Sequence, residues 1–246
     1  MTTWLHAVLD LPADDGGATA FWAKALGWPL GEPWPGQPEL RSFTPPAGDA
    51  YLHRQTVAGP AAVHLDLEVA DVDAETRRLV ALGAAPVRRT DGWQTLRSPG
   101  GLPLCLVAGR THASRPAPLT TAGGHRRRLV QVCVDIPPQH LAVEAAFWRA
   151  ALGWREVAID DPEFLGRLVP PAGSALQVLL QRLGADDGAT ATRAHLDLGA
   201  GGGVAADAAL LQDLGATHLH DGSGFVALRD PAGLAFCTTG NDPDAP

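Results

Sequence analysis

The tetrapeptide His-Leu-Asp-Leu occurs twice in this sequence, at residues 64–67 and again at residues 195–198. Both copies lie where apolar and polar residues alternate, the pattern of a half-buried β-strand. Because alternate side chains of a strand point to the same face, each histidine shares a face with the aspartate two residues later. An imidazole beside a carboxylate can take up and release protons. The candidate catalytic acid or base groups are therefore His64, Asp66, His195 and Asp197.

Each of these groups also has a structural interpretation. A histidine could hydrogen-bond the carboxylate of a neighbouring strand. The aspartates could pair with Arg97 and Arg229, which stand at matching positions on later strands. The sequence leaves both interpretations open, although it favours the pairing of the aspartates with the arginines.

Other side chains are expected on the same face of the sheet or at its mouth. Trp93 and Phe225 could stack on a flat ligand, and Trp34, in a Pro-Trp-Pro loop, could form a lid or merely pack along the loop. Gln55 and Gln181 could hydrogen-bond a ligand or border the sheet. The predicted ligand-binding residues are Trp34, Gln55, Trp93, Arg97, Gln181, Phe225 and Arg229.

The three cysteines, Cys105, Cys133 and Cys237, are widely spaced and form no Cys-x-x-Cys sequence. An odd number at such spacing gives no disulfide framework, so we expect free thiols in a reducing compartment. Cys105 and Cys237 stand in apolar surroundings, where a free cysteine usually behaves as a small hydrophobic residue.

An internal duplication places these groups in the chain. Residues 20–28 read Ala-Phe-Trp-Ala-Lys-Ala-Leu-Gly-Trp, and residues 146–154 read Ala-Phe-Trp-Arg-Ala-Ala-Leu-Gly-Trp. Residues 98–105, Ser-Pro-Gly-Gly-Leu-Pro-Leu-Cys, recur at 230–237 as Asp-Pro-Ala-Gly-Leu-Ala-Phe-Cys. The repeats keep their order, which indicates two tandem copies. We expect domain 1 over residues 1–108, a linker over 109–128, domain 2 over 129–240 and a tail over 241–246.

The expected linker is rich in Pro, Thr, Ala and Gly and has no apolar period. It ends in the basic run His125-Arg126-Arg127-Arg128. A phosphate or partner patch is one interpretation of this run. We favour a solvated start of the next strand, because charge runs are usually solvated.

Each copy is predicted to contain two units of one strand, one helix and three strands. Period-two alternation predicts a strand over 4–11, and apolar residues at helical spacing predict a helix over 14–26 that Gly27 ends. A Pro-rich loop is expected over 29–38. The other predicted elements of copy 1 are strands over 39–44, 50–57, 63–69, 85–89, 93–97 and 102–107 and a helix over 73–82. Four such βαβββ units predict an α+β fold with two curled mixed sheets and the helices outside.

The chain of 246 residues has 19 Lys and Arg against 27 Asp and Glu, a formal net charge of −8. This balance argues against nucleic acid and anionic membranes as partners, since both are bound through clustered cations. No basic segment followed by an apolar one opens the sequence, and no apolar run approaches the length of a membrane span. We therefore expect a soluble, cytoplasmic protein.

The paired βαβββ units, the Phe-Trp-x-x-Ala-Leu-Gly-Trp helix end, the His-Leu-Asp-Leu strand and the Asp-Pro-x-Gly turn resemble the vicinal oxygen chelate superfamily. That superfamily includes glyoxalase I, bleomycin-resistance proteins, fosfomycin-resistance proteins and extradiol dioxygenases. The likeness is closest to its glyoxalase-like branch and covers essentially the whole chain in two copies. It implies the tandem glyoxalase/bleomycin-resistance/dioxygenase fold, with a cup-shaped small-molecule site.

In metal-using members of the superfamily, the resemblance implies a divalent ion held by His or Gln, then His, then Glu. Carried over, these positions fall on His6, His64 and Cys105 in domain 1. In domain 2 they fall on Gln131, His195 and Cys237. Cysteine thus stands where those enzymes have glutamate. A His/His/Cys set suits Zn²⁺ rather than Mg²⁺, Mn²⁺ or the Fe(II) triad that requires a carboxylate.

The missing carboxylates lead to a first hypothesis: a metal-independent small-molecule binding protein of the bleomycin-resistance type, with no cofactor. The alternative is a metal-dependent lyase- or dioxygenase-like enzyme that binds Zn, Ni or Fe in domain 1 through His6, His64 and Cys105. A metal-free isomerase or lyase with Asp66 or His64 as base is a third hypothesis. The expected partner is a small-molecule ligand. The two copies are expected to form a pseudo-dimer within a monomer, or the chain a homodimer.

Overall fold

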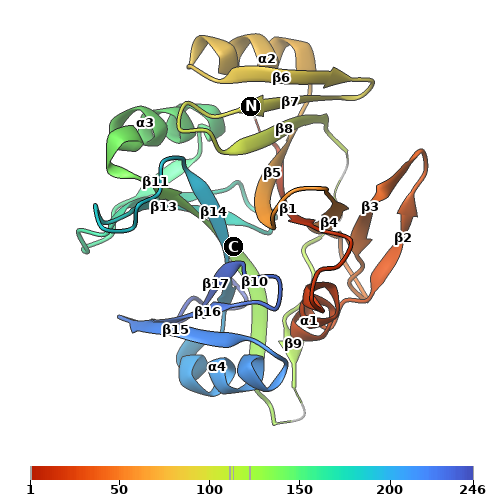
Figure 1. The fold of residues 1–246 in the computed structure, drawn as a ribbon, viewed down its shortest axis with the longest axis vertical. Helices are drawn as coiled ribbons and strands as arrows, with labels where there is room; N and C mark the ends of the chain where they lie inside the picture. The colour runs from red at the N-terminus through yellow and green to blue at the C-terminus, as the bar shows by residue number, and fades with distance from the viewer. Residues whose placement is uncertain (1, 111, 113, 122, 246) are drawn as a thin grey trace. The chain divides into compact units, whose positions relative to one another are not determined.

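The computed structural model describes residues 2–110, 112, 114–121 and 123–245, which form an α+β fold with two mixed sheets (Figure 1). The elements of the first half are β1 (Trp4–Leu11), α1 (Ala18–Leu26), β2 (Leu30–Trp34), β3 (Gln37–Phe43), β4 (Leu52–Thr56), β5 (Ala62–Val69), α2 (Val72–Ala81), β6 (Ala85–Thr90), β7 (Trp93–Arg97) and β8 (Pro103–Ala108). The predicted fold class and the two βαβββ units of this half are confirmed.

The second half repeats this order after the short strand β9 (Leu119–Thr120). Its elements are β10 (Arg126–Ile136), η1 (Pro138–His140), α3 (Leu141–Leu152), β11 (Arg155–Val157), β12 (Phe164–Val169), β13 (Gln177–Arg182), β14 (Arg193–Gly199), η2 (Gly201–Gly203), α4 (Val204–Asp213), β15 (Thr217–Gly222), β16 (Phe225–Arg229) and β17 (Ala235–Thr239). The strand orders are β2-β3-β4-β1-β5-β8-β7-β6 and β11-β12-β13-β10-β14-β17-β16-β15, and β9 pairs with β10. Two equivalent sheets are what a duplicated sequence predicts.

Two predictions for the N-terminal region are wrong in detail. The first helix begins at Ala18 rather than at residue 14, because Gly16 and Gly17 have φ angles of 60° and 97°, outside the right-handed helical region. The predicted loop over 29–38 is a hairpin in which β2 pairs antiparallel with β3, Trp34 opposite Gln37. Pro33 is tolerated there because β2 is the edge strand of its sheet.

The chain separates into two compact units that do not follow the sequence copies. Unit 1 comprises Met1–Ala7, Val63–His112 and Val132–Ala194. Unit 2 comprises Val8–Ala62, Ala113–Gln131 and His195–Pro246. Each unit therefore combines one helical segment of the first copy with one of the second. Within unit 1, α2 lies along β6, β7 and β8, and within unit 2, α4 lies along β16 and β17 (Figure 1).

Each unit ties a buried helical tryptophan to a carboxylate. In unit 2, Trp22 of α1 donates its indole N–H to Oδ2 of Asp230 at 2.8 Å. In unit 1, Trp148 of α3 donates to Oε1 of Glu144 at 2.8 Å, and the amide of Gly100 donates to Oε2 at 2.5 Å. Copy 1 has Ser98 at the position of Asp230, so its turn has no carboxylate. The carboxylate that accepts from Trp148 in unit 1 is that of Glu144, on α3.

The basic run that closes the expected linker is not a solvated strand start, so that interpretation is wrong for two of its arginines. Arg127 and Arg128 are each 2% exposed. Nε of Arg127 lies 3.1 Å from Oδ1 of the wholly buried Asp207, and Arg128 donates to the carbonyl oxygen of Pro243 at 2.6 Å. Arg126 does lie at the surface, paired with Asp244. The run therefore holds unit 2 together.

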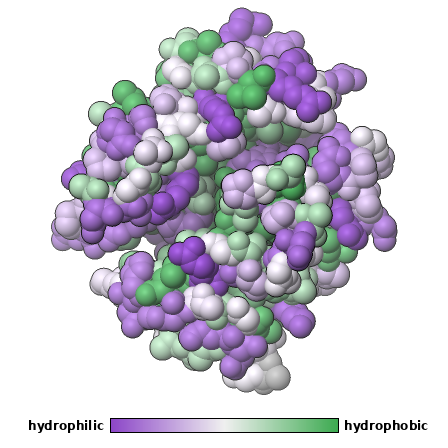
Figure 2. All heavy atoms as spheres, in the orientation of Figure 1, coloured by the Kyte–Doolittle hydropathy of each residue, from purple (hydrophilic) through white to green (hydrophobic). Residues whose placement is uncertain are grey.

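The face of the molecule drawn in Figure 2 is mostly polar, with scattered apolar residues. The exposed large hydrophobic side chains among the described residues are Val80 of α2, Leu82 directly after it, Val87 of β6, Val143 of α3 and Leu219 of β15. No helix in the part of the chain described has the length and apolar character needed to span a bilayer. Cys105, Cys133 and Cys237 form no disulfide bond in the described structure, as predicted.

Candidate functional site

In unit 1 the structure brings together His64, Asp66 and Cys105. Asp66 of β5 stands opposite Cys105 of β8, and Cys105 stands opposite Thr95 of β7, so one row of side chains crosses three strands. Nε2 of His64 lies 3.3 Å from Oδ1 of Asp66. One ligand atom of each of the three residues lies within 4.8 Å of the others. His64 is buried, and Asp66 and Cys105 are half-buried.

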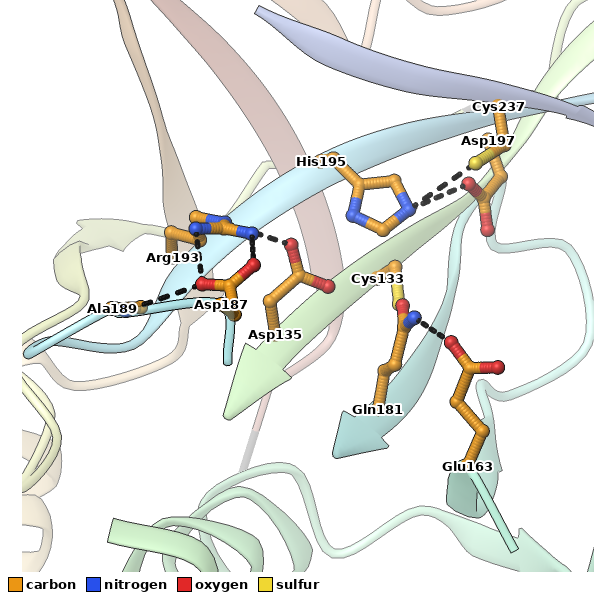
Figure 3. Close-up of polar contacts among 10 residues, drawn as sticks. All are labelled: Cys133, Asp135, Glu163, Gln181, Asp187, Ala189, Arg193, His195, Asp197 and Cys237. Carbon is orange, nitrogen blue, oxygen red and sulfur yellow. Dashed lines mark hydrogen bonds and ion pairs between the residues drawn. The ribbon is translucent and has the colours of Figure 1, made fainter. Parts of the chain in front are cut away.

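Unit 2 repeats this arrangement with His195, Asp197 and Cys237. Nε2 of His195 lies 3.3 Å from Oδ1 of Asp197 and 3.6 Å from Sγ of Cys237, as the dashed lines of Figure 3 show. Gln131, at the family's first position, donates from Nε2 to Oδ2 of Asp197 at 2.5 Å. Both predicted His–Asp pairs are thus adjacent in space, through the strand alternation that the sequence displays.

The burial of Cys105 determines the state of its thiol. Burial raises the pKa of Cys105, and the negative charge of Asp66 raises it further, whereas hydrogen bonds with His64 and Thr95 lower it less. The net direction is upward, so the group at the last-strand position is a neutral thiol at pH 7. A neutral thiol is a weak nucleophile and does not replace the charge of a glutamate.

Four of the predicted ligand-binding residues lie beside these groups in the strand register. Trp93 stands opposite Val107 and Arg97 opposite Pro103, on the face of β7 that carries Thr95. Phe225 and Arg229 hold the equivalent places on β16. Arg97 donates to the carbonyl oxygen of Gly101 at 3.0 Å, and Arg229 to that of Gly233 at 2.7 Å. The described contacts of the two arginines are therefore with the turns before the last strands, and not with Asp66 and Asp197, the pairing that the sequence favoured.

The remaining ligand-binding predictions fall elsewhere. Trp34 ends β2, where its indole N–H donates to Oγ of Ser42 at 3.0 Å and its ring meets that of His53 edge-on at 5.1 Å. It is part of a strand rather than a lid loop. Gln55 lies half-buried on β4, opposite Leu40.

Gln181 of β13 links two other groups of unit 1. Its Oε1 accepts from the thiol of Cys133 at 3.0 Å, and its Nε2 donates to Oε1 of Glu163 at 2.5 Å (Figure 3). Both ends of this amide are thus engaged with protein partners. Gln181 supports the sheet in this arrangement.

The structure does not bring His6 into one group with His64 and Cys105. Nε2 of His6 lies 2.9 Å from Oε1 of Glu68, and Nε2 of His112 lies 2.8 Å from Oε2 of the same carboxylate. The amide of Arg110 also donates to Oε2, at 3.0 Å. Burial alone would raise the pKa of Glu68, but hydrogen bonds from His6, the Arg110 amide and His112 outweigh it and lower the pKa to about 2.

Sequence reasoning missed Glu68 and His112 as site residues. The strand alternation does place Glu68 on the face of His64 and Asp66, so that signal was present. His112 follows β8 in a segment with no periodicity, and only the tertiary structure brings it to Glu68.

The His64, Asp66 and Cys105 group fits only some metals. It offers one nitrogen, one oxygen and one sulfur ligand, each a ligand type that Zn²⁺ takes. It supplies one histidine where the two-histidine, one-carboxylate triad of Fe(II) oxygenases needs two. Residues His195, Asp197 and Cys237 of unit 2 offer the same set.

The family described as Glyoxalase-like domain has a model that matches residues 6–107 and 131–239, which is most of the chain in two repeats. No curated protein matches the chain. The match boundaries follow the two copies seen in the sequence.

Solved structures share the fold over nearly the whole chain. A mutant of 4-hydroxymandelate synthase from Streptomyces coelicolor is 17% identical at a TM-score of 0.65, covering 98% of this chain and 94% of that one. An extradiol ring-cleaving dioxygenase from B. fuscum is 17% identical at a TM-score of 0.61, covering 100% and 75%. A catechol 2,3-dioxygenase is 15% identical at a TM-score of 0.54, covering 100% and 95%. At such identities the likeness establishes the fold alone.

Proposed function

The chain belongs to the glyoxalase-like domain family of the vicinal oxygen chelate superfamily, and from this premise we propose that it binds a small organic molecule without a metal. The observation that carries the proposal is the last-strand position, where each copy has a cysteine. Burial raises the pKa of the Cys105 thiol, so this position carries no permanent negative charge, and a divalent ion could bind there only with loss of the thiol proton.

The strand face around Cys105 supports an aromatic ligand that carries hydroxyl groups. Trp93 is half-buried and offers a ring for stacking. The adjacent His64 and Asp66 offer both a donor and an acceptor for a phenolic hydroxyl. Phe225, His195 and Asp197 repeat these features in the second copy.

Isothermal titration calorimetry with catechol and with 4-hydroxymandelate, in the presence of a chelator, tests this function. These probes follow the names of the structural neighbours. We expect binding of at least one of them, weakened about tenfold by Trp93→Ala through loss of about 1.4 kcal/mol of stacking and burial. Val87→Ala, at an exposed position of the neighbouring strand β6, should bind as the unmodified protein does. Binding that occurs only after a metal is added would contradict the proposal.

A zinc-dependent enzyme is the second candidate, which the His64, Asp66 and Cys105 group favours. These three residues would hold the ion, and the ion would supply a Lewis acid for a bound carbonyl. The carboxylate oxygen of Asp66 that the ion would leave free could accept a proton from the substrate.

Cys105→Ser separates the two candidates. In a zinc enzyme it removes the sulfur ligand, so metal-dependent turnover should fall by more than about 100-fold, since even outer-shell changes at zinc sites cost 10- to 100-fold. In a metal-free binding protein it exchanges one small neutral group for another, so the affinity for the probe should change little. Steady-state assay and calorimetry on the same preparation give both results.

A further inference from the structure

We propose that His6, Glu68 and His112 form a binding site for one divalent transition-metal ion of the Zn²⁺ class. The site uses His6 of the family's ligand positions but neither His64 nor Cys105. It shares none of the three residues His64, Asp66 and Cys105 with the small-molecule site, and it does not rest on the proposed function.

The geometry of the three side chains supports metal binding. Both imidazoles present the same atom, Nε2, to opposite oxygens of one carboxylate, at 2.9 and 2.8 Å. Two imidazole nitrogens and one carboxylate oxygen are the ligand set of several zinc enzymes. Ligand atoms around Zn²⁺ lie roughly 3.3 Å apart, given bonds of about 2.0–2.1 Å. Each nitrogen–oxygen pair would need to separate by only about half an ångström to admit the ion, and the three ligand atoms already lie within 4.8 Å of one another.

The charge of the cluster also favours a cation. Glu68 is 2% exposed and is the acidic member of the cluster. Among the described residues, the partners of this carboxylate are two imidazoles and one backbone amide, with no Lys or Arg side chain. A divalent cation would add the permanent positive charge that these partners of the buried carboxylate do not supply.

The surroundings hold the ligands in place. The indole of Trp4 stacks on the His112 ring with centroids 4.0 Å apart and planes inclined by 8°. The Arg110 amide donates to Oε2 of Glu68 and would continue to orient the carboxylate. Such outer-shell contacts are typical supports of metal ligands.

The second copy lacks this set. At the positions equivalent to His6 and Glu68 it has Gln131 and Gly199. The proposal therefore requires one ion per chain, bound in unit 1, where it would fasten the segment after β8 to β1 and β5.

Native mass spectrometry and calorimetry with ZnCl₂ on the full, chelator-treated chain test the site. We expect one Zn²⁺ per chain and a rise in melting temperature on its addition. His112 lies outside the strands, so His112→Gln is the substitution least expected to disturb folding. It should lower the Zn²⁺ affinity more than about 100-fold and abolish the rise in melting temperature. Glu68→Gln should do the same. Cys105→Ser and His64→Ala should still bind one ion.

Substitution with Co²⁺ provides a second measurement that does not depend on the variants. A site of two imidazoles and a carboxylate should give visible ligand-field absorption without the near-ultraviolet band of a cobalt–thiolate bond. The proposal is overturned if the chain binds no stoichiometric Zn²⁺, if His112→Gln binds it as before, or if the thiolate band is present and disappears in Cys105→Ser.

Discussion

Replacing Asp207 by asparagine is expected to lower the free energy of unfolding by about 3–5 kcal/mol, the cost of leaving a buried charge without its partner. Asp207 is wholly buried and accepts from Oγ1 of Thr238 at 2.6 Å. Nε2 of His125 lies 2.8 Å from its Oδ1, and Nε of Arg127 lies 3.1 Å from the same atom. The amide would leave the Arg127 guanidinium buried and charged without an anion.

The neighbouring arginine of the same run supplies the matched control. Arg126 pairs with Asp244 at 2.6 Å, but both side chains are about half exposed. Water and salt screen such a pair, so Asp244→Asn should not change stability measurably. Urea denaturation followed by circular dichroism measures both variants. Equal effects of the two substitutions would show that burial does not set the strength of these pairs.

The second large effect is expected for Glu144→Ala, with a loss of about 2–6 kcal/mol in the free energy of unfolding, since each of two buried donors left without an acceptor costs about 1–3 kcal/mol. Glu144 is 0% exposed, and its two oxygens accept from the Trp148 indole and the Gly100 amide. Alanine is the best helix former, so the loss would not come from helix propensity.

Glu156→Ala is the control for Glu144→Ala. Glu156 pairs with Arg149 at 2.7 Å, and both side chains are 38% exposed. An exposed ion pair of this kind contributes about 0–1 kcal/mol. Near-ultraviolet circular dichroism of the tryptophans and urea denaturation would compare the two variants. A Glu144→Ala variant as stable as Glu156→Ala would contradict the role assigned to the buried carboxylate.

The sequence by itself determined the duplication, the order of the elements and the fold. Period-two alternation over residues 63–69 required that His64 and Asp66 share a face. In the structure, Nε2 of His64 lies 3.3 Å from Oδ1 of Asp66. This succeeds because side-chain direction in a strand depends on the backbone alone. The ends of the helices and strands were less predictable. The positive φ angles of Gly16 and Gly17 make α1 begin only at Ala18, and β2 can contain Pro33 because it is the edge strand of its sheet.

Only the tertiary structure decided which distant groups meet. His112 reaches Glu68 from a segment without any pattern, and Arg127 is buried against Asp207 although its basic run suggested a solvated surface. In unit 2 the turn itself supplies the carboxylate, Asp230, that accepts from a helical tryptophan. In unit 1 the corresponding carboxylate is Glu144 of α3, which also accepts from the amide of Gly100. Alternation and helical spacing are local properties that each segment carries with it. The pairing of a buried charge depends on which remote side chain the packed fold brings within about 3 Å, and no local pattern encodes that choice.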